Sequence, residues 1–216
     1  QNRPLPSGRM SVQSALIIAI ILTVLGLLVL YTINTRTAFF GGISIFLYVC
    51  IYTPLKTKTP LAVFVGAFPG AIPFMLGWVA YTDQFGVESG VLFMIQFFWQ
   101  FPHFWAIGWM LDDDYKKAGF KMLPSGNPDN ATAFQIVFYT LWMLVISLLP
   151  ATAYTGTFNL SMVATIIVGC IGFVMLYFAI QLMIQKTKES AKKLMFTSVG
   201  YITLLQIIYV IDKMIL

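Results

Sequence analysis

Three consecutive aspartates, Asp112 to Asp114, follow a long apolar run and are followed at once by Tyr115 and two lysines. Hydrocarbon does not tolerate adjacent carboxylates, so the apolar run must reach a polar surface here. Neighbouring carboxylates repel one another, and a divalent cation relieves that repulsion. Such oxygen ligands suit Mg²⁺, which usually binds carboxylates together with substrate phosphates. The alternative interpretation is a solvated helix end without chemical function.

The one histidine of the sequence, His103, lies eleven residues before Asp114, which is roughly 16 Å along a helix. That depth is near the middle of a bilayer, where ionisable groups are costly and usually functional. A neutral imidazole hydrogen-bonded to Gln96 or Gln100 is the structural interpretation. The functional interpretation is contact with a heme, as an iron ligand or as a neighbour of a propionate or vinyl group.

The elements that must position these residues are membrane helices. The chain has 216 residues, of which 59% are hydrophobic and 10% charged, whereas ordinary globular domains are about 25% charged. Seven apolar stretches have the ~18 residues or more that a helix needs to cross hydrocarbon. They are Ser11–Ile33, Thr37–Leu55, Leu61–Tyr81, Ser89–Leu111, Thr132–Tyr154, Leu160–Ile184 and Leu194–Ile211. We therefore expect an all-α, polytopic transmembrane helical bundle.

Basic residues predict how this bundle is oriented. If the seven helices alternate in direction, eleven basic residues lie on the side of the aspartates and two lie on the other. The first side holds Arg3, Arg9, Lys56, Lys58, Lys116, Lys117, Lys121, Lys186, Lys188, Lys192 and Lys193, and the second holds Arg36 and Lys213. This bias places the first side in the cytoplasm, or in an equivalent such as the mitochondrial matrix. The net charge of +5 thus reports topology and contact with anionic lipid, not nucleic-acid binding.

Two spans have compositions that suit a substrate cavity. In 61–81, Gly66 and Gly70 permit close helix approach, and Pro69 and Pro73 free backbone carbonyls that must find partners or line a cavity. Tight packing is the simpler interpretation there. The aromatic side chains of 89–111 could line a site for a polyisoprenoid tail or a flat macrocycle, and their rings could stabilise a carbocation. Lipid contact is the simpler interpretation for several of them.

Three sequence blocks carry a family resemblance: QNRPLPSGRMS, YTPLKTKTPLAVFVGAFPGAIPFMLGW and FWQFPHFWAIGWMLDDDYKKAGFKMLP. In this order they closely resemble the protoheme IX farnesyltransferase (heme O synthase) family, a branch of the UbiA-type intramembrane prenyltransferases. The similarity runs from Gln1 at least to Pro124. That family has nine transmembrane helices and two acidic motifs, after helices two and six. We therefore expect one prenyltransferase domain over residues 1–216, N-terminally truncated, with seven of about nine helices and without the first two helices and the first acidic motif.

The resemblance also implies roles for individual residues. The second acidic motif maps best onto Asp114 and Tyr115. The wider superfamily often has two aspartates four residues apart, and here Met110 stands where the first would be, which leaves the choice of metal ligands open. The implied assignments are Asp114 and Lys56 as catalytic residues, Asp113 and Asp114 as metal ligands, Arg3, Arg9, Lys58 and Lys117 as diphosphate-binding residues, and His103 as a heme-binding residue.

The implied reaction transfers a farnesyl group from farnesyl diphosphate to a vinyl group of heme b. Water is added, heme O and diphosphate are formed, and Mg²⁺ bridges the diphosphate. Heme O serves heme-copper terminal oxidases, so heme A synthase or oxidase assembly factors are the expected protein partners, with the lipid bilayer as the setting. The expected location is the bacterial cytoplasmic membrane or the mitochondrial inner membrane, with the site on the cytoplasmic or matrix side.

Two other functions remain possible from the residues. A UbiA-type enzyme acting on an aromatic quinone precursor would share the fold and the metal chemistry. A transporter or channel is the alternative that is not an enzyme, because bundles with broken helices also transport. Transport does not explain an acidic cluster beside lysines.

Overall fold

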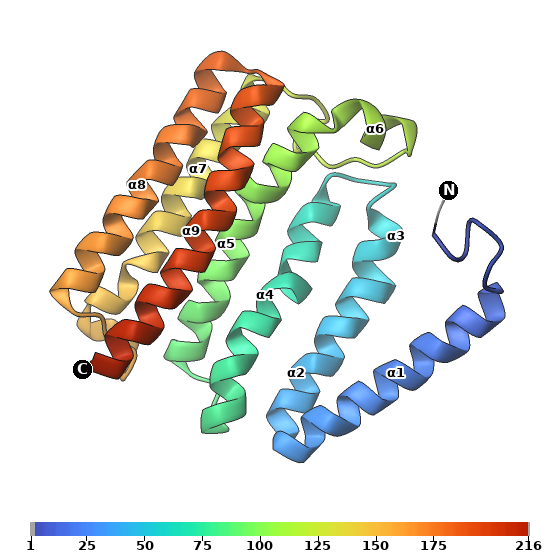
Figure 1. Ribbon diagram of the computed structural model, residues 1–216, viewed down its shortest axis with the longest axis horizontal. Helices are drawn as coiled ribbons and strands as arrows, with labels where there is room; N and C mark the ends of the chain where they lie inside the picture. Colours follow the sequence, from blue (N-terminus) through green and yellow to red (C-terminus); the bar gives the residue numbers. More distant parts are fainter. Residues whose placement is uncertain (1–2, 216) are drawn as a thin grey trace.

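The computed structural model of the chain describes residues 3–215, in which the regular structure is helical throughout (Figure 1). The expected all-α bundle is confirmed. The elements are α1 (Val12–Ile33), α2 (Thr35–Phe46), the π-helix η1 (Leu47–Tyr52), α3 (Thr53–Leu55), α4 (Leu61–Thr82), α5 (Val87–Met110), α6 (Asp112–Lys117), α7 (Asn130–Ser147), the short 3₁₀ turns η2 (Leu149–Ala151) and η3 (Ala153–Thr155), α8 (Met162–Gln185) and α9 (Lys188–Ile215).

Within the described residues, six helical segments are long and apolar enough to cross a membrane. They are α1, the continuous segment Thr35–Leu55, α4, the segment Asn130–Ala151, α8 and α9. The seventh predicted span corresponds to α5, which has 24 residues and packs against α4, α7 and α9. Its glutamines and its histidine interrupt the apolar run, so α5 is not among the six. The chain is a multi-pass membrane protein with α5 at the centre of the bundle.

Two predicted boundaries are wrong, and local chemistry explains both. The predicted span Thr132–Tyr154 stops being α-helical at Ser147, because Pro150 has no N–H to donate and disfavours a helical residue before it. The last helix begins at Lys188, six residues before the predicted start. There Thr187 and Ser190 cap each other, with Ser190 N donating to Thr187 Oγ1 at 3.1 Å and Thr187 N donating to Ser190 Oγ at 3.2 Å.

Neighbouring helices donate hydrogen bonds to two carbonyl groups of α4, one of which lacks its helical donor because of a proline. Pro73 has no N–H for the carbonyl of Pro69, and Ser44 Oγ on α2 donates to that oxygen at 3.0 Å. Gln100 Nε2 on α5 donates to the carbonyl of Ala67 at 3.0 Å. Both hydrogen bonds hold α4 between α2 and α5, as expected of a proline-containing membrane helix.

Interhelical hydrogen bonds and packing hold α7, α8 and α9 together beside α5. Tyr201 Oη on α9 donates to Ser147 Oγ on α7 at 2.7 Å, and Tyr209 Oη donates to the carbonyl of the same serine. On α8, Gly172 allows Leu144 to pack against the helix backbone. In contrast, α1 has no buried residue and packs against α2 near the turn that joins them (Figure 1).

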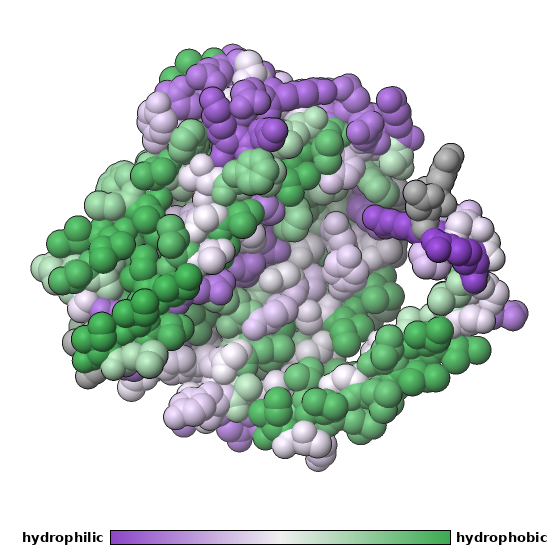
Figure 2. Space-filling view, in the orientation of Figure 1, coloured by the Kyte–Doolittle hydropathy of each residue, from purple (hydrophilic) through white to green (hydrophobic). Residues whose placement is uncertain are grey.

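The two ends of the bundle differ in polarity. Hydrophilic surface gathers over α6 and the turn between α8 and α9, whereas α1 and α8 present apolar surface (Figure 2). We call the end that carries α6, residues 56–60, residues 118–129 and the α8–α9 turn the α6 end. Arg36 lies at the opposite end, where its Nη1 is 2.9 Å from Asp83 Oδ1. Lys213 lies there too, with its Nζ bonded to the carbonyl of Thr157 at 3.1 Å.

Candidate functional site

The three carboxylates of α6 point toward three different lysines and not toward one another. The helix is a short turn that begins after Leu111, where the backbone leaves the helical conformation of α5. The pairs are Asp112 Oδ2 with Lys116 Nζ at 2.8 Å, Asp113 Oδ2 with Lys188 Nζ at 2.8 Å, and Asp114 Oδ1 with Lys117 Nζ at 3.9 Å.

Asp112 is the aspartate of α6 that faces inward. Its side chain is 14% exposed, against 71% for Asp113 and 74% for Asp114. Lys116 bonds Asp112 and also Asn127 Oδ1 at 3.0 Å, and Asp112 and Lys116 line a cavity of about 460 Å³ under α6. The sequence interpretation included Asp112 in the acidic cluster but assigned it no role of its own, although its spacing of four residues from Lys116 is typical of a helical ion pair.

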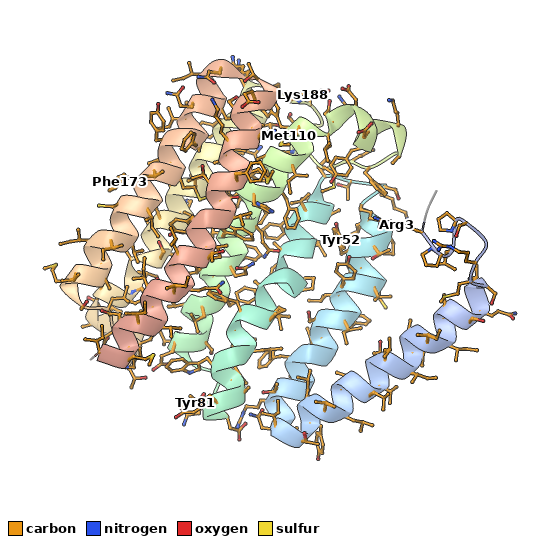
Figure 3. All side chains as sticks on the ribbon, viewed as in Figure 1. Arg3, Tyr52, Tyr81, Met110, Phe173 and Lys188 are labelled. Atoms are coloured by element: carbon orange, nitrogen blue, oxygen red, sulfur yellow. The ribbon has the colours of Figure 1, made fainter. Side chains whose placement is uncertain are left out.

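The ion pair between Asp113 and Lys188 joins α6 to the first turn of α9. Figure 3 shows Lys188 at the same end of the bundle as Met110, the last residue of α5. The hydrogen bond from Lys188 lowers the pKa of Asp113, and the charge of Lys188 lowers it further. The carboxylate of Asp113 therefore stays ionised beside the lysine.

This shift predicts how the contact depends on pH. The lowered pKa of Asp113 means that its contribution to stability is fully present above the ordinary carboxyl pKa and is lost as pH falls through the lowered value. We expect Lys188→Met to return the pKa of Asp113 toward its usual value, measured by carboxyl ¹³C NMR titration. An unchanged midpoint would contradict the pair, and Lys186→Met is the matched control.

A complete magnesium site is not assembled by the described residues. Within 3–215, no group of three or more His, Cys, Asp or Glu side chains is placed to hold a metal ion. The carboxylates of α6 are the right kind of donor for Mg²⁺, but they are fewer than its six ligands and each lies near a lysine. The role of Asp113 and Asp114 as metal ligands therefore stays a prediction.

The loop between α3 and α4 is fastened to the segment that follows α6. Lys121 N donates to the carbonyl of Lys56 at 3.0 Å, and Lys56 Nζ lies 5.2 Å from the centroid of the Phe120 ring. Lys58 is exposed in the same loop. The structure thus brings Lys56 close to the segment that follows α6, and the catalytic role of Lys56 stays a prediction.

The other basic residues that were expected to bind diphosphate lie on exposed parts of the surface. Lys117 is 80% exposed on α6. Arg3 and Arg9 belong to the exposed segment before α1, where Ser7 N donates to the carbonyl of Arg3 at 3.0 Å and Arg9 Nε donates to Ser7 Oγ at 3.0 Å. Figure 3 marks Arg3 on this segment, beyond the start of α1. Their roles in binding diphosphate stay predictions.

A cavity of about 560 Å³ extends from the α6 end into the bundle between α2 with η1, α4 and α5. Met122 lines it, and Tyr52 lines it from η1 (Figure 3). The Tyr52 ring packs directly on Gly66, because a Cβ at that position would lie 2.7 Å from the ring. The walls are mainly apolar, so the cavity suits a hydrocarbon chain.

Gln100 is a polar residue in this cavity wall. It is 4% exposed, and its Nε2 donates to the carbonyls of Ala67 at 3.0 Å and Gln96 at 3.2 Å. Gly70 leaves room for its Oε1, which a Cβ at that position would overlap. The sequence interpretation had considered Gln100 only as a partner of His103.

His103 faces α9 instead of the two glutamines. Its Nδ1 lies 2.7 Å from Ser198 Oγ, and its ring stacks on Trp99 at 4.6 Å between centroids. Trp99 Nε1 donates to the carbonyl of Ser198 at 2.7 Å. The expected hydrogen bond to Gln96 or Gln100 is therefore wrong. Contact between His103 and heme stays a prediction, and no spacing in the sequence could have revealed a partner 95 positions away.

Known proteins resemble the chain over its full length. The sequence profile of the UbiA prenyltransferase family matches residues 1–200. A protein of Christiangramia forsetii named "Protoheme IX farnesyltransferase" is 66% identical over 215 residues, which is 100% of this chain and 72% of that protein. Proteins of the same name from Flavobacterium psychrophilum and Cytophaga hutchinsonii are 63% and 44% identical, and cover 99% and 98% of this chain and 71% and 73% of their own lengths.

A solved structure has the same fold. It is described as "Structural and mechanistic insights into the biosynthesis of Digeranylgeranylglyceryl phosphate synthase in membranes". The TM-score is 0.81 at 20% identity, covering 100% of this chain and 75% of the other. At that identity the likeness concerns the arrangement of helices alone.

Proposed function

This chain belongs to the UbiA prenyltransferase family, and we propose that it transfers a farnesyl group from farnesyl diphosphate to a vinyl group of heme b. Water is added in the reaction, and heme O and diphosphate are the products. One observation carries the proposal: relatives at 66% and 63% identity over nearly the whole chain are named "Protoheme IX farnesyltransferase". The heme acceptor is thereby favoured over an aromatic quinone precursor.

The arrangement of charge and apolar surface supports a reaction of this kind. Diphosphate binds at the α6 end, where Lys56, Lys58 and Lys117 offset its charge together with Arg3 and Arg9. The farnesyl chain lies in the cavity beside Tyr52 and Gly66. Negative charge develops on the diphosphate as it leaves. Positive groups placed beside it are usually the largest single contribution to such catalysis. The apolar walls keep bulk water away from the carbocation.

Asp113 and Asp114 would hold Mg²⁺ beside the diphosphate, and the family resemblance implies a further acidic motif as the source of its other ligands. When bound, the ion supplies Lewis-acid stabilisation of the leaving diphosphate. Lys117 and Lys188 lie beside these carboxylates in the structure. They would compete with a cation for Asp113 and Asp114.

The proposal includes a setting for the reaction. The α6 end faces the cytoplasm, or the matrix in a mitochondrion, because it gathers most of the basic residues. The membrane is the bacterial cytoplasmic or mitochondrial inner membrane. Heme O then passes to an enzyme that oxidises it further, such as heme A synthase, or to assembly factors of a terminal oxidase.

The decisive test is an assay of the intact protein in membranes with heme b, farnesyl diphosphate and Mg²⁺. Mass spectrometry of the extracted porphyrin should detect heme O, and omission of either organic substrate should abolish it. A phenolic quinone precursor in place of heme b is the competing acceptor. Prenylation of the phenol without formation of heme O would overturn the proposal.

Replacing His103 with alanine should weaken heme binding if this residue contacts the substrate. We expect the heme absorbance of the purified protein to be lost in His103→Ala at heme concentrations that saturate the wild type. Ser198→Ala is the matched control, because it removes the hydrogen-bond partner of the imidazole but keeps the ring. Unchanged spectra in His103→Ala would leave the histidine only a packing role between α5 and α9.

A further inference from the structure

We propose that Gln100 positions the water that is added to the substrate, and this inference rests on the proposed function. The amide of Gln100 is held in one orientation, because both of its N–H groups are used. They donate to the carbonyls of Ala67 and Gln96. The Oε1 atom therefore occupies the space left by Gly70 in the cavity wall.

This oxygen has no donor within the part of the chain that the structure describes. The hydrogen bonds of Gln100 are the two that its Nε2 donates, although the residue is 96% buried, given its 4% exposure. Among the described residues, the fully buried side-chain atoms without a partner are Thr37 Oγ1 and Trp105 Nε1, so Gln100 Oε1 is accessible from the cavity that the residue lines. An O–H or N–H group of a molecule in the cavity can therefore donate to this acceptor.

Water is the reactant that can do so. The farnesyl chain and the vinyl edge of the porphyrin carry no O–H or N–H group, so neither can donate to Gln100. A trapped water needs two to four polar partners. Ser44 Oγ, which donates to the carbonyl of Pro69, keeps its acceptor lone pairs and lines the same cavity, as does Tyr52.

The proposed reaction requires this water once the cation has formed on the former vinyl group. The bond between C1 of the farnesyl chain and the diphosphate oxygen breaks, and its electron pair leaves with diphosphate. The π electrons of the vinyl group form the bond to C1, which leaves a cation at the vinyl carbon next to the porphyrin ring. The oxygen of the water attacks this carbon, and the released proton passes to diphosphate.

Loss of the positioned water would divert the reaction. The cation would then lose a proton from the adjacent CH₂ to diphosphate, and the product would be an alkene that is lighter than heme O by one water. A residue that only holds α4 against α5 would change the total turnover but not the ratio of these two products. The ratio is therefore the informative measurement.

The test compares four forms of the intact protein in membranes by mass spectrometry of the porphyrin products. We expect Gln100→Leu to lower the ratio of heme O to the alkene by about tenfold, the effect of one lost hydrogen bond. Gly70→Ala should shift the ratio the same way, because its Cβ displaces Oε1 while the amide remains. Gln96→Leu removes an amide one turn earlier on α5 and should leave the ratio unchanged.

Each outcome decides the matter. An unchanged ratio in Gln100→Leu and Gly70→Ala, or a folded Gln100→Leu that forms neither product, overturns the role of Gln100. If Gln100→Leu does not fold, the ratio in Gly70→Ala decides. If the wild type forms neither product, the proposed function itself fails, which is distinguishable because Gln96→Leu is then inactive as well.

Discussion

Replacement of Asp114 with alanine is expected to lower heme O formation by about 10²- to 10³-fold, the usual cost of removing one group that stabilises developing charge. The fold should not suffer. The Asp114 side chain is 74% exposed, and its ion pair with Lys117 is long at 3.9 Å. We expect the free energy of unfolding to change by less than about 0.5 kcal/mol. Single-turnover product analysis and thermal denaturation of the same preparation measure the two quantities.

The matched control is Glu189→Ala. Glu189 is another exposed carboxylate at the α6 end, in the first turn of α9. A general loss of negative charge at this end would affect both variants equally. Full activity of Asp114→Ala would refute the role of Asp114, and equal losses in the two variants would reduce it to an effect of net charge.

Gly66→Leu is the second substitution with a large expected effect. A side chain at this position meets the Tyr52 ring, since a Cβ would already lie 2.7 Å from it, and the rest of the leucine fills the cavity. Overpacking of this kind typically costs about 1–3 kcal/mol of stability. We expect turnover to fall about 100-fold, because small misplacements of bound substrate are that costly.

Gly77→Leu provides the comparison on the same helix. A Cβ at Gly77 would meet no atom within 4 Å, and leucine has a higher helix propensity than glycine at both positions. The difference in turnover between the two variants therefore measures the effect of filling the cavity. Turnover and substrate binding in Gly66→Leu that equal those of Gly77→Leu would show that the farnesyl chain lies elsewhere.

The sequence was sufficient to predict the helical spans, because each is an apolar run long enough to cross hydrocarbon. The asymmetric lysines and arginines predicted that α6 and the α8–α9 turn share one end. The end of α7 could have been read from Pro150. The π-helix before Thr53 could not, since nothing in the residues of Leu47–Tyr52 distinguishes it from an ordinary turn of helix.

The sequence indicated which candidate residues lie at the α6 end, but not which way their side chains face. The aspartate cluster was correctly expected at the end of an apolar helix, yet the inward position of Asp112 depends on how α6 turns after Leu111. Likewise, the pairing of His103 with Ser198 depends on the rotation of α5 against α9. Such relations between distant elements are set by packing, and periodicity within one helix does not determine them.

The backbone hydrogen bond from Lys121 to Lys56 joins the two loops at the α6 end. Because main-chain atoms form this link, alanine scanning of the lysines would leave it intact, and only a residue without an amide hydrogen at position 121 would cut it. The link therefore couples the position of each loop to that of the other.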